Sequence, residues 1–175
     1  MKCVMLSIRP QWVEKIASGE KTIEVRETRP KIETPFKCYI YCTIGNGVKG
    51  NYLVQSGIQC GKVVGEFICD KIVKYRYTKP WLYNGKKIYH LPLDTINTCL
   101  SYNEIEEYLG NKDGYGWNIS ELKIYDKPKE LGKFKHWMNN KDYDGWNEQR
   151  TKIIKGFVLR PLTRPPQSWC YVEEL

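Results

Sequence analysis

Three of the four charged residues within residues 19–26, namely Lys21, Glu24 and Arg26, have types and a spacing that could carry chemistry. We predict a strand over residues 22–26, directly after a glycine turn. Because side chains alternate along a strand, Glu24 and Arg26 would share one face, with Lys21 at the turn before them. An ammonium, a carboxylate and a guanidinium would then meet, which is enough to hold a polar ligand and to move a proton on it. The alternative is a solvated strand face whose ion pair has little energetic weight.

Two short elements must position this segment. A buried strand is expected over residues 4–8, followed by a short helix that begins at Pro10 and ends at Gly19. Proline suits the first position of a helix, and glycine suits the residue just past its end. The free amides at the helix start would lie beside Arg9, with Ser7 just before it. We predict a small phosphate-binding site there, and ordinary strand–helix packing is the alternative.

The composition is that of a folded, basic protein. The chain has 175 residues, 41% of them hydrophobic, and a formal net charge of +8, so we expect one domain over residues 1–175. The charge favours an anionic partner, nucleic acid ahead of a membrane surface, although many basic proteins have no such partner. The sequence shows neither a signal-peptide pattern nor an apolar run of membrane-spanning length, so we expect a cytoplasmic protein without a membrane partner.

The cysteines indicate reduced thiols. Seven are present, an odd number, with no Cys-x-x-Cys pair and only two histidines in the chain. Such a set packs as small apolar side chains in a reducing compartment more readily than it builds a disulfide framework. We therefore expect neither a metal site nor a cofactor.

Residues 71–90 are basic and aromatic, and we interpret them as a hairpin insertion. They contain six cations and no acidic residue, and the dipeptide Asn84-Gly85 is typical of a hairpin turn. Basic side chains can follow a phosphate backbone while aromatic rings stack on unpaired bases. Lys74, Arg76 and Trp81 are therefore candidate nucleic-acid contacts. The alternative is a hairpin whose rings pack on the domain and whose lysines are solvated.

The remaining pattern predicts many short strands and few short helices. Ser101 and Glu104 form a capping box that opens a helix ending at Leu109. Further strands are predicted over residues 37–44, 62–73 (the longest), 117–124, 156–161 and 168–172, with a turn over 125–131 and an elaboration over 133–152. This is a mixed α+β class, and we predict a small closed or nearly closed β-barrel with short peripheral helices.

These pieces together resemble ASCH domains of the PUA-like superfamily. The main motif is Gly19-x-Lys21-x-x-Glu24-x-Arg26, preceded by residues 6–10. Weaker matches follow in order at residues 62–67, 117–122 and 125–131. The resemblance implies a PUA-like barrel with a cleft lined by the Lys21, Glu24 and Arg26 positions, in a family thought to act on RNA or modified nucleosides.

Activity varies within this family. One bacterial branch hydrolyses acylated cytidine with a lysine, a threonine and a glutamate. Lys21 matches the lysine, but Glu24 stands at the threonine position. The third carboxylate is not placed, and its candidates are Glu104, Glu106 and Glu107. Another branch has been proposed to cut RNA, and larger proteins use the domain as a binding module.

Two hypotheses follow. In the first, the domain binds single-stranded RNA or a nucleotide-like ligand: Arg9 holds phosphate, Arg26 and Arg29 fork onto phosphate or a base edge, and Glu24 accepts from an exocyclic amine. In the second, it is a metal-independent hydrolase, an acylated-cytidine amidohydrolase or a ribonuclease, with Lys21 and Glu24 as catalytic residues. A purely structural ion-pair cluster is the remaining alternative.

Overall fold

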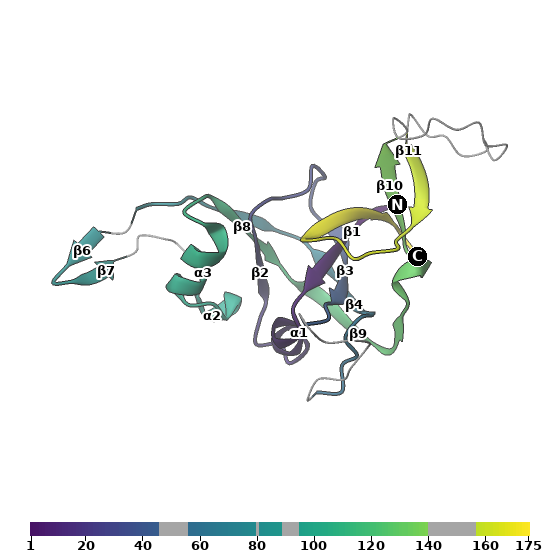
Figure 1. Ribbon diagram of the computed structural model, residues 1–175, viewed down its shortest axis with the longest axis horizontal. Coiled ribbons are helices and arrows are strands. Elements are labelled where there is room, and N and C mark those ends of the chain that lie inside the picture. The colour runs from purple at the N-terminus through teal and green to yellow at the C-terminus, as the bar shows by residue number, and fades with distance from the viewer. Residues whose placement is uncertain (46–55, 80, 89–94, 140–156) are drawn as a thin grey trace. The chain divides into compact units, whose positions relative to one another are not determined.

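The computed structural model describes residues 1–45, 56–79, 81–88, 95–139 and 157–175. Its helices are α1 (Pro10–Ala17), α2 (Thr95–Thr98), α3 (Tyr102–Leu109) and the 3₁₀ helix η1 (Leu131–Lys133) (Figure 1). Its strands are β1 (Lys2–Ile8), β2 (Ile23–Arg26), β3 (Phe36–Cys42), β4 (Val63–Cys69), β5 (Ile72–Tyr75), β6 (Trp81–Tyr83), β7 (Lys86–Ile88), β8 (Gly114–Asn118), β9 (Ser120–Lys129), β10 (Lys135–Asn139), β11 (Phe157–Pro161) and β12 (Trp169–Glu173).

Contacts divide the chain into two compact units. The first unit contains Met1–Pro10, Cys38–Gly65 and Tyr125–Leu175, and the second contains Gln11–Lys37 and Glu66–Ile124. The strands β3, β4 and β9 have residues in both. The largest sheet has seven strands in the hydrogen-bonded order β11-β10-β12-β1-β3-β4-β9.

The core of the first unit is built on β1. This strand pairs in parallel with β3 and antiparallel with β12, with Val4 opposite both Cys38 and Tyr171. Its residues from Cys3 to Ile8 are all buried, as expected for a strand with neighbours on both sides and covered faces. The core cluster beside it comprises Cys3, Met5, Tyr39, Tyr41, Val63, Phe134, Leu162 and Val172.

The second unit holds a three-stranded sheet in the order β2-β8-β5 and a separate two-stranded sheet, β6-β7. Strand β8 is central, and its residue Gly116 lies opposite Val25 on β2 and Val73 on β5. A second core cluster of Val25, Tyr75, Ile105 and Leu109 joins this sheet to α3. The sheet thereby fixes β2, the strand that carries the charged motif.

Local signals read from the sequence are confirmed at the ends of several elements. The α1 helix begins at Pro10, and Gly19 lies beyond its end with φ +80°. At the start of α3 the Ser101 side chain accepts from the Glu104 amide, and the Glu104 carboxylate accepts from the Ser101 amide at 2.8 Å. Asn84 and Gly85 have φ of 50° and 73°, the left-handed values of a type I′ hairpin turn between β6 and β7.

Other expectations need correction. Residues 62–73 form two strands, β4 and β5, in different sheets, because the chain leaves the large sheet at Asp70 and Lys71. The strand over 117–124 likewise divides: β8 ends at Asn118 and β9 begins at Ser120. The prediction of a turn over 125–131 is wrong in its first part, since β9 continues to Lys129. At ten residues β9, and not the segment 62–73, is the longest strand described.

The mixed α+β class is confirmed, because strands dominate and the helices are few and short. The predicted closed barrel is not found: over the described residues, the seven-stranded sheet ends at β11 on one side and β9 on the other. Of the elaboration over 133–152, the structure describes only residues up to 139, and the rest lies outside the described residues. No helix within the described ranges is long and apolar enough to cross a membrane.

Candidate functional site

Two residues of the charged motif, Glu24 and Arg26, lie on β2 in the second unit's sheet, and Lys21 lies in the turn just before this strand. The backbone N–H of Lys21 donates to Lys15 O at 2.9 Å, which ties the turn after α1 to the helix. In β2, Glu24 lies opposite Trp117 and Arg26 lies opposite Tyr115 on β8. The alternation of the strand therefore puts the Glu24 and Arg26 side chains on the same face.

Lys21, Glu24 and Arg26 form one buried cluster, named here the charged cluster. Lys21 Nζ lies 3.3 Å from Glu24 Oε2, and Arg26 Nη2 lies 2.9 Å from Glu24 Oε1. The three side chains are 1%, 8% and 6% exposed. Each carboxylate oxygen thus faces a different cation, away from bulk water. The interpretation of this strand face as solvated surface is wrong, and the expected meeting of the three groups is confirmed.

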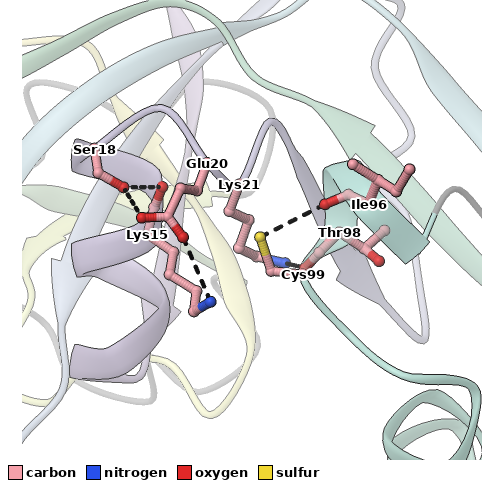
Figure 2. Close-up of polar contacts among 7 residues, drawn as sticks. All are labelled: Lys15, Ser18, Glu20, Lys21, Ile96, Thr98 and Cys99. Carbon is pink, nitrogen blue, oxygen red and sulfur yellow. Dashed lines mark hydrogen bonds and ion pairs between the residues drawn. The ribbon is translucent and has the colours of Figure 1, made fainter.

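Lys21 also reaches a second element. Its ammonium donates to Thr98 O at 2.6 Å, at the end of α2 (Figure 2). It further lies 5.4 Å from the centre of the Trp12 ring of α1, within the range of a cation–π contact. The next residue, Thr22, is held by two backbone hydrogen bonds. Its N–H donates to Asn97 O at 2.9 Å, and its carbonyl oxygen accepts from the Ile119 N–H. The ammonium therefore connects β2, α1 and α2 within the second unit.

Tyr108 connects the charged cluster to the surface. This residue of α3 is 41% exposed, and its phenol oxygen accepts a hydrogen bond from the Arg26 side chain. Partial burial raises the pKa of the Tyr108 phenol above its ordinary 10.0, the Arg26 guanidinium opposes that rise, and Glu24 and Glu27 add to it. At neutral pH Tyr108 is therefore a neutral hydroxyl beside a buried guanidinium.

Two residues of the candidate phosphate-binding site, Ser7 and Arg9, lie in the first unit. Ser7 is 8% exposed, and its hydroxyl donates to Pro166 O at 2.6 Å, so it serves the packing of that unit. Arg9 is exposed, and so is Arg29 in the loop after β2. Their roles as ligand contacts stay predictions.

The candidates in the basic segment are exposed. Lys74 Nζ pairs with Asp113 Oδ2 at 2.9 Å, and the Tyr77 amide donates to the same carboxylate. The Lys74 hydrogen bond, followed by the amide, holds the pKa of Asp113 below its ordinary value. Lys74 is thus partly engaged, whereas Arg76 is exposed and Trp81 is 52% exposed.

The third carboxylate has three sequence candidates, and one is engaged elsewhere. The Glu104 carboxylate accepts from the Ser101 amide and from the Ser101 hydroxyl, and these bonds lower its pKa. Its geometry is that of a helix cap. Glu106 is half-buried and Glu107 is exposed, and both stay candidates. Within the described ranges, no group of three His, Cys, Asp or Glu residues could hold a metal ion.

Sequence reasoning missed three partners of the charged cluster. Thr98 lies 77 positions from Lys21 and contributes only its backbone carbonyl, so no side-chain signal could have marked it. Trp12 belongs to α1, and its contact with the ammonium depends on the turn after that helix. Tyr108 lies between the buried Ile105 and Leu109 on α3, and only the docking of that helix brings it to Arg26.

Comparisons with known proteins give a fold relationship. No family model matches the sequence, and no curated protein matches it. Solved structures of an ASCH protein from Zymomonas mobilis do match, with 17% identity over 98% of this chain and 87% of that chain at a TM-score of 0.55. Its variants with tyrosine replaced by phenylalanine and with serine replaced by alanine match at TM-scores of 0.58 and 0.56, over 90% and 88% of their chains.

Proposed function

We propose that this chain, which has an ASCH-like fold, binds a nucleotide-like ligand, either a free nucleotide or modified nucleoside or a residue of single-stranded RNA, at the charged cluster of Lys21, Glu24 and Arg26. The observation that carries the proposal is the burial of these three charged side chains, none more than 8% exposed, on β2 and in the turn just before it. The cleft implied by the family resemblance is part of this proposal.

Burial of charge supports a role beyond stability. Removing an ion from water costs several kcal/mol, and well-packed apolar residues often stabilise a fold as well as a buried ion pair does. For the stability of the fold alone, apolar side chains would therefore fill this site as well as two cations around one carboxylate do. The charged groups are well suited to a ligand that has both anionic and hydrogen-bonding groups.

Each residue has a chemical task in the proposed complex. Arg26 would present its planar fork to a phosphate or a base edge. Glu24, held in place by its two cations, would accept from an exocyclic amine, as carboxylates do when they recognise cytosine. Tyr108, the exposed partner of Arg26, is where a ligand would first meet the charged cluster. The net charge of +8 would favour approach of an anion.

The direct test is titration calorimetry of the four ribonucleoside 5′-monophosphates against wild type and Arg26→Lys. The substitution keeps the charge but loses the fork, so we expect affinity to fall about tenfold, the value of one good charge-assisted hydrogen bond. Arg164→Lys is the matched control, because Arg164 is an exposed arginine that has no place in the proposed site. Melting curves check that both variants fold. Equal affinity in wild type and Arg26→Lys, or no binding by wild type, would refute the proposal.

A hydrolase is the second candidate, favoured by the 3.3 Å contact between the Lys21 ammonium and the Glu24 carboxylate in a water-poor setting. Lys21 would act as base or stabilise an oxyanion, and Glu24 would orient it. The engagement of both Glu24 oxygens by cations fits orientation better than proton abstraction.

The test for hydrolysis uses N4-acetylcytidine and labelled single-stranded RNA, followed by chromatography and gel electrophoresis. Wild type is compared with Lys21→Met and with Lys15→Met, which removes an exposed lysine of α1 (Figure 2). Product that disappears in Lys21→Met and persists in Lys15→Met supports catalysis. Turnover that is unchanged in Lys21→Met excludes Lys21 from it.

A further inference from the structure

Strands β6 and β7 form a separate two-stranded sheet in the second unit (Figure 1). The first of these strands exposes aromatic and apolar side chains. Trp81, Leu82 and Tyr83 are 52%, 71% and 62% exposed. Isolated apolar residues at a surface are ordinary, but three in succession on one short strand mark a site where something binds. The charged cluster does not use any of them.

The two rings and one lysine occupy the same face of this sheet, named here the aromatic face. Trp81 and Tyr83 are two residues apart in β6, and Lys86 lies opposite Tyr83 in β7. Side chains at such positions point the same way, whereas Leu82 points to the opposite face. The tight turn at Asn84 and Gly85 sets this register, so the aromatic face is built by the hairpin itself.

The ring geometry suits stacking on separate bases. The ring centres of Trp81 and Tyr83 are 6.4 Å apart, and their planes are inclined by 49°. One flat base cannot lie parallel to both rings, so each ring can take its own base. Bases in a duplex hide their faces from such contacts, whereas unpaired bases offer them.

The charge around the aromatic face complements a phosphate backbone. Residues 71–90 contain no acidic residue, and the described cations Lys71, Lys74, Arg76, Lys79 and Lys86 are all exposed. Asp113 offsets Lys74 through its ion pair, which leaves an excess of positive charge along the segment. An apolar protein partner would not require these cations, and their number therefore favours a polyanion.

We infer that the aromatic face of the β6-β7 hairpin binds single-stranded RNA by stacking one base on Trp81 and one on Tyr83, with Lys86 and the basic segment before it on the backbone. This surface is additional to the charged cluster, and it extends the proposed function from one nucleotide to a strand. Lys86 contributes charge only, so binding is tolerant of sequence, because every base has a stacking face.

The test is fluorescence anisotropy of a labelled single-stranded RNA decamer with wild type, the double variant Trp81→Ala/Tyr83→Ala and the control Leu82→Ala. Stacking on an aromatic ring raises the affinity for RNA about tenfold per base, so the double variant should bind the decamer about a hundredfold more weakly. Leu82→Ala removes the most exposed side chain of β6 from the opposite face and should change affinity less than twofold. Trp81→Phe/Tyr83→Phe should retain most of the affinity.

Further outcomes separate this inference from the proposed function. Mononucleotide binding by calorimetry should be the same in wild type and in the double alanine variant. If wild type binds mononucleotides but not the decamer, the inference fails and the proposed function stands. If decamer binding is lost in the double variant and no mononucleotide binds, the inference stands alone. A loss of RNA affinity in Leu82→Ala equal to that in the double alanine variant would overturn the inference. A double alanine variant that keeps its RNA affinity and loses binding to anionic vesicles would overturn it as well.

Discussion

The charged cluster and the aromatic face reverse the usual placement of side chains in opposite ways. Lys21, Glu24 and Arg26 are charged and buried, while Trp81 and Tyr83 are aromatic and more than half exposed. Both arrangements are unfavourable for an isolated fold, since buried charges lose hydration and exposed rings keep apolar surface in water. The two regions together contain the group types needed for nucleic acid, cations and stacking rings.

The difference between them lies in how tightly the fold determines each. The charged cluster is fixed by ion pairs among its own residues and by contacts from α1, α2 and α3. The aromatic face needs only a two-residue turn and one strand pair. We therefore expect the first region to be selective and sensitive to substitution, and the second to be tolerant. The following variants test that contrast.

The largest effect is expected from Lys21→Met. It leaves Glu24 Oε2 and Thr98 O buried without their ammonium partner, and breaking a buried ion pair costs about 3–5 kcal/mol. For a chain of this size the melting temperature should fall by about 10 °C. Lys15→Met is the control, because the Lys15–Glu20 pair at 3.6 Å is exposed and should matter by less than about 1 kcal/mol.

Replacing all three charges at once sharpens this result. The variant Lys21→Met/Glu24→Leu/Arg26→Met leaves no buried charge without a partner, so it should recover much of the stability lost by Lys21→Met while losing ligand binding. A triple variant less stable than Lys21→Met would show that the charged cluster serves the fold, and the comparison with the aromatic face would then lose its functional meaning.

Gly116→Ala should have the next largest effect, because it disturbs the sheet that carries the charged cluster. An added Cβ would lie 2.2 Å from Tyr75 Oη and 2.6 Å from Tyr75 Cζ, and Tyr75 is only 2% exposed. Overpacking of this kind costs about 1–3 kcal/mol, measurable by urea denaturation. Gly132→Ala meets nothing nearer than 4.0 Å and is the control. If Tyr75→Phe does not soften the effect, the predicted clash is not its cause.

Ser101→Ala should lower stability by about 1 kcal/mol, since it removes the cap of α3, the helix that bears Tyr108. Part of this difference depends on pH. The Ser101 amide and, after it, the Ser101 hydroxyl lower the Glu104 pKa below 4.5. Alanine removes only the hydroxyl bond, so the contribution of that bond is present above pH 4.5 and disappears as pH falls through the folded pKa. Denaturation at pH 7 and pH 3 should show a smaller gap between the two proteins at pH 3. A gap independent of pH would assign the whole effect to the uncharged cap.

The smallest effect on stability is expected from Trp81→Ala/Tyr83→Ala, at about 0.5 kcal/mol or less, because the side chains are mostly exposed. Lys21→Met, which destabilises most, should in turn leave a folded hairpin at low temperature that still binds the RNA decamer. If the double alanine variant instead loses about 2 kcal/mol, the aromatic face packs against the protein and is unavailable to a strand.

Features that depend on neighbouring residues could be predicted from the sequence. The helix limits at Pro10 and Gly19, the Ser101 cap and the hairpin turn at Asn84-Gly85 follow from backbone preferences of those residues, and the structure confirms them. Alternation along β2 likewise predicted that Glu24 and Arg26 share a face. The spacing of the main motif resembled ASCH domains, and the fold agrees with that resemblance.

Only the tertiary structure decided what depends on long-range packing. Alternation cannot tell whether a polar strand face is covered, and it was the pairing of β2 with β8 and the docking of α2 and α3 that buried Glu24 and Arg26. The same holds for Thr98 and Tyr108, which meet the motif from distant segments. The break between β4 and β5 reflects a change of sheet, which local propensity does not report. Exposure of Trp81 and Tyr83 is decided in the same way, because a ring that stacks on RNA and one that packs in a core have the same sequence signal.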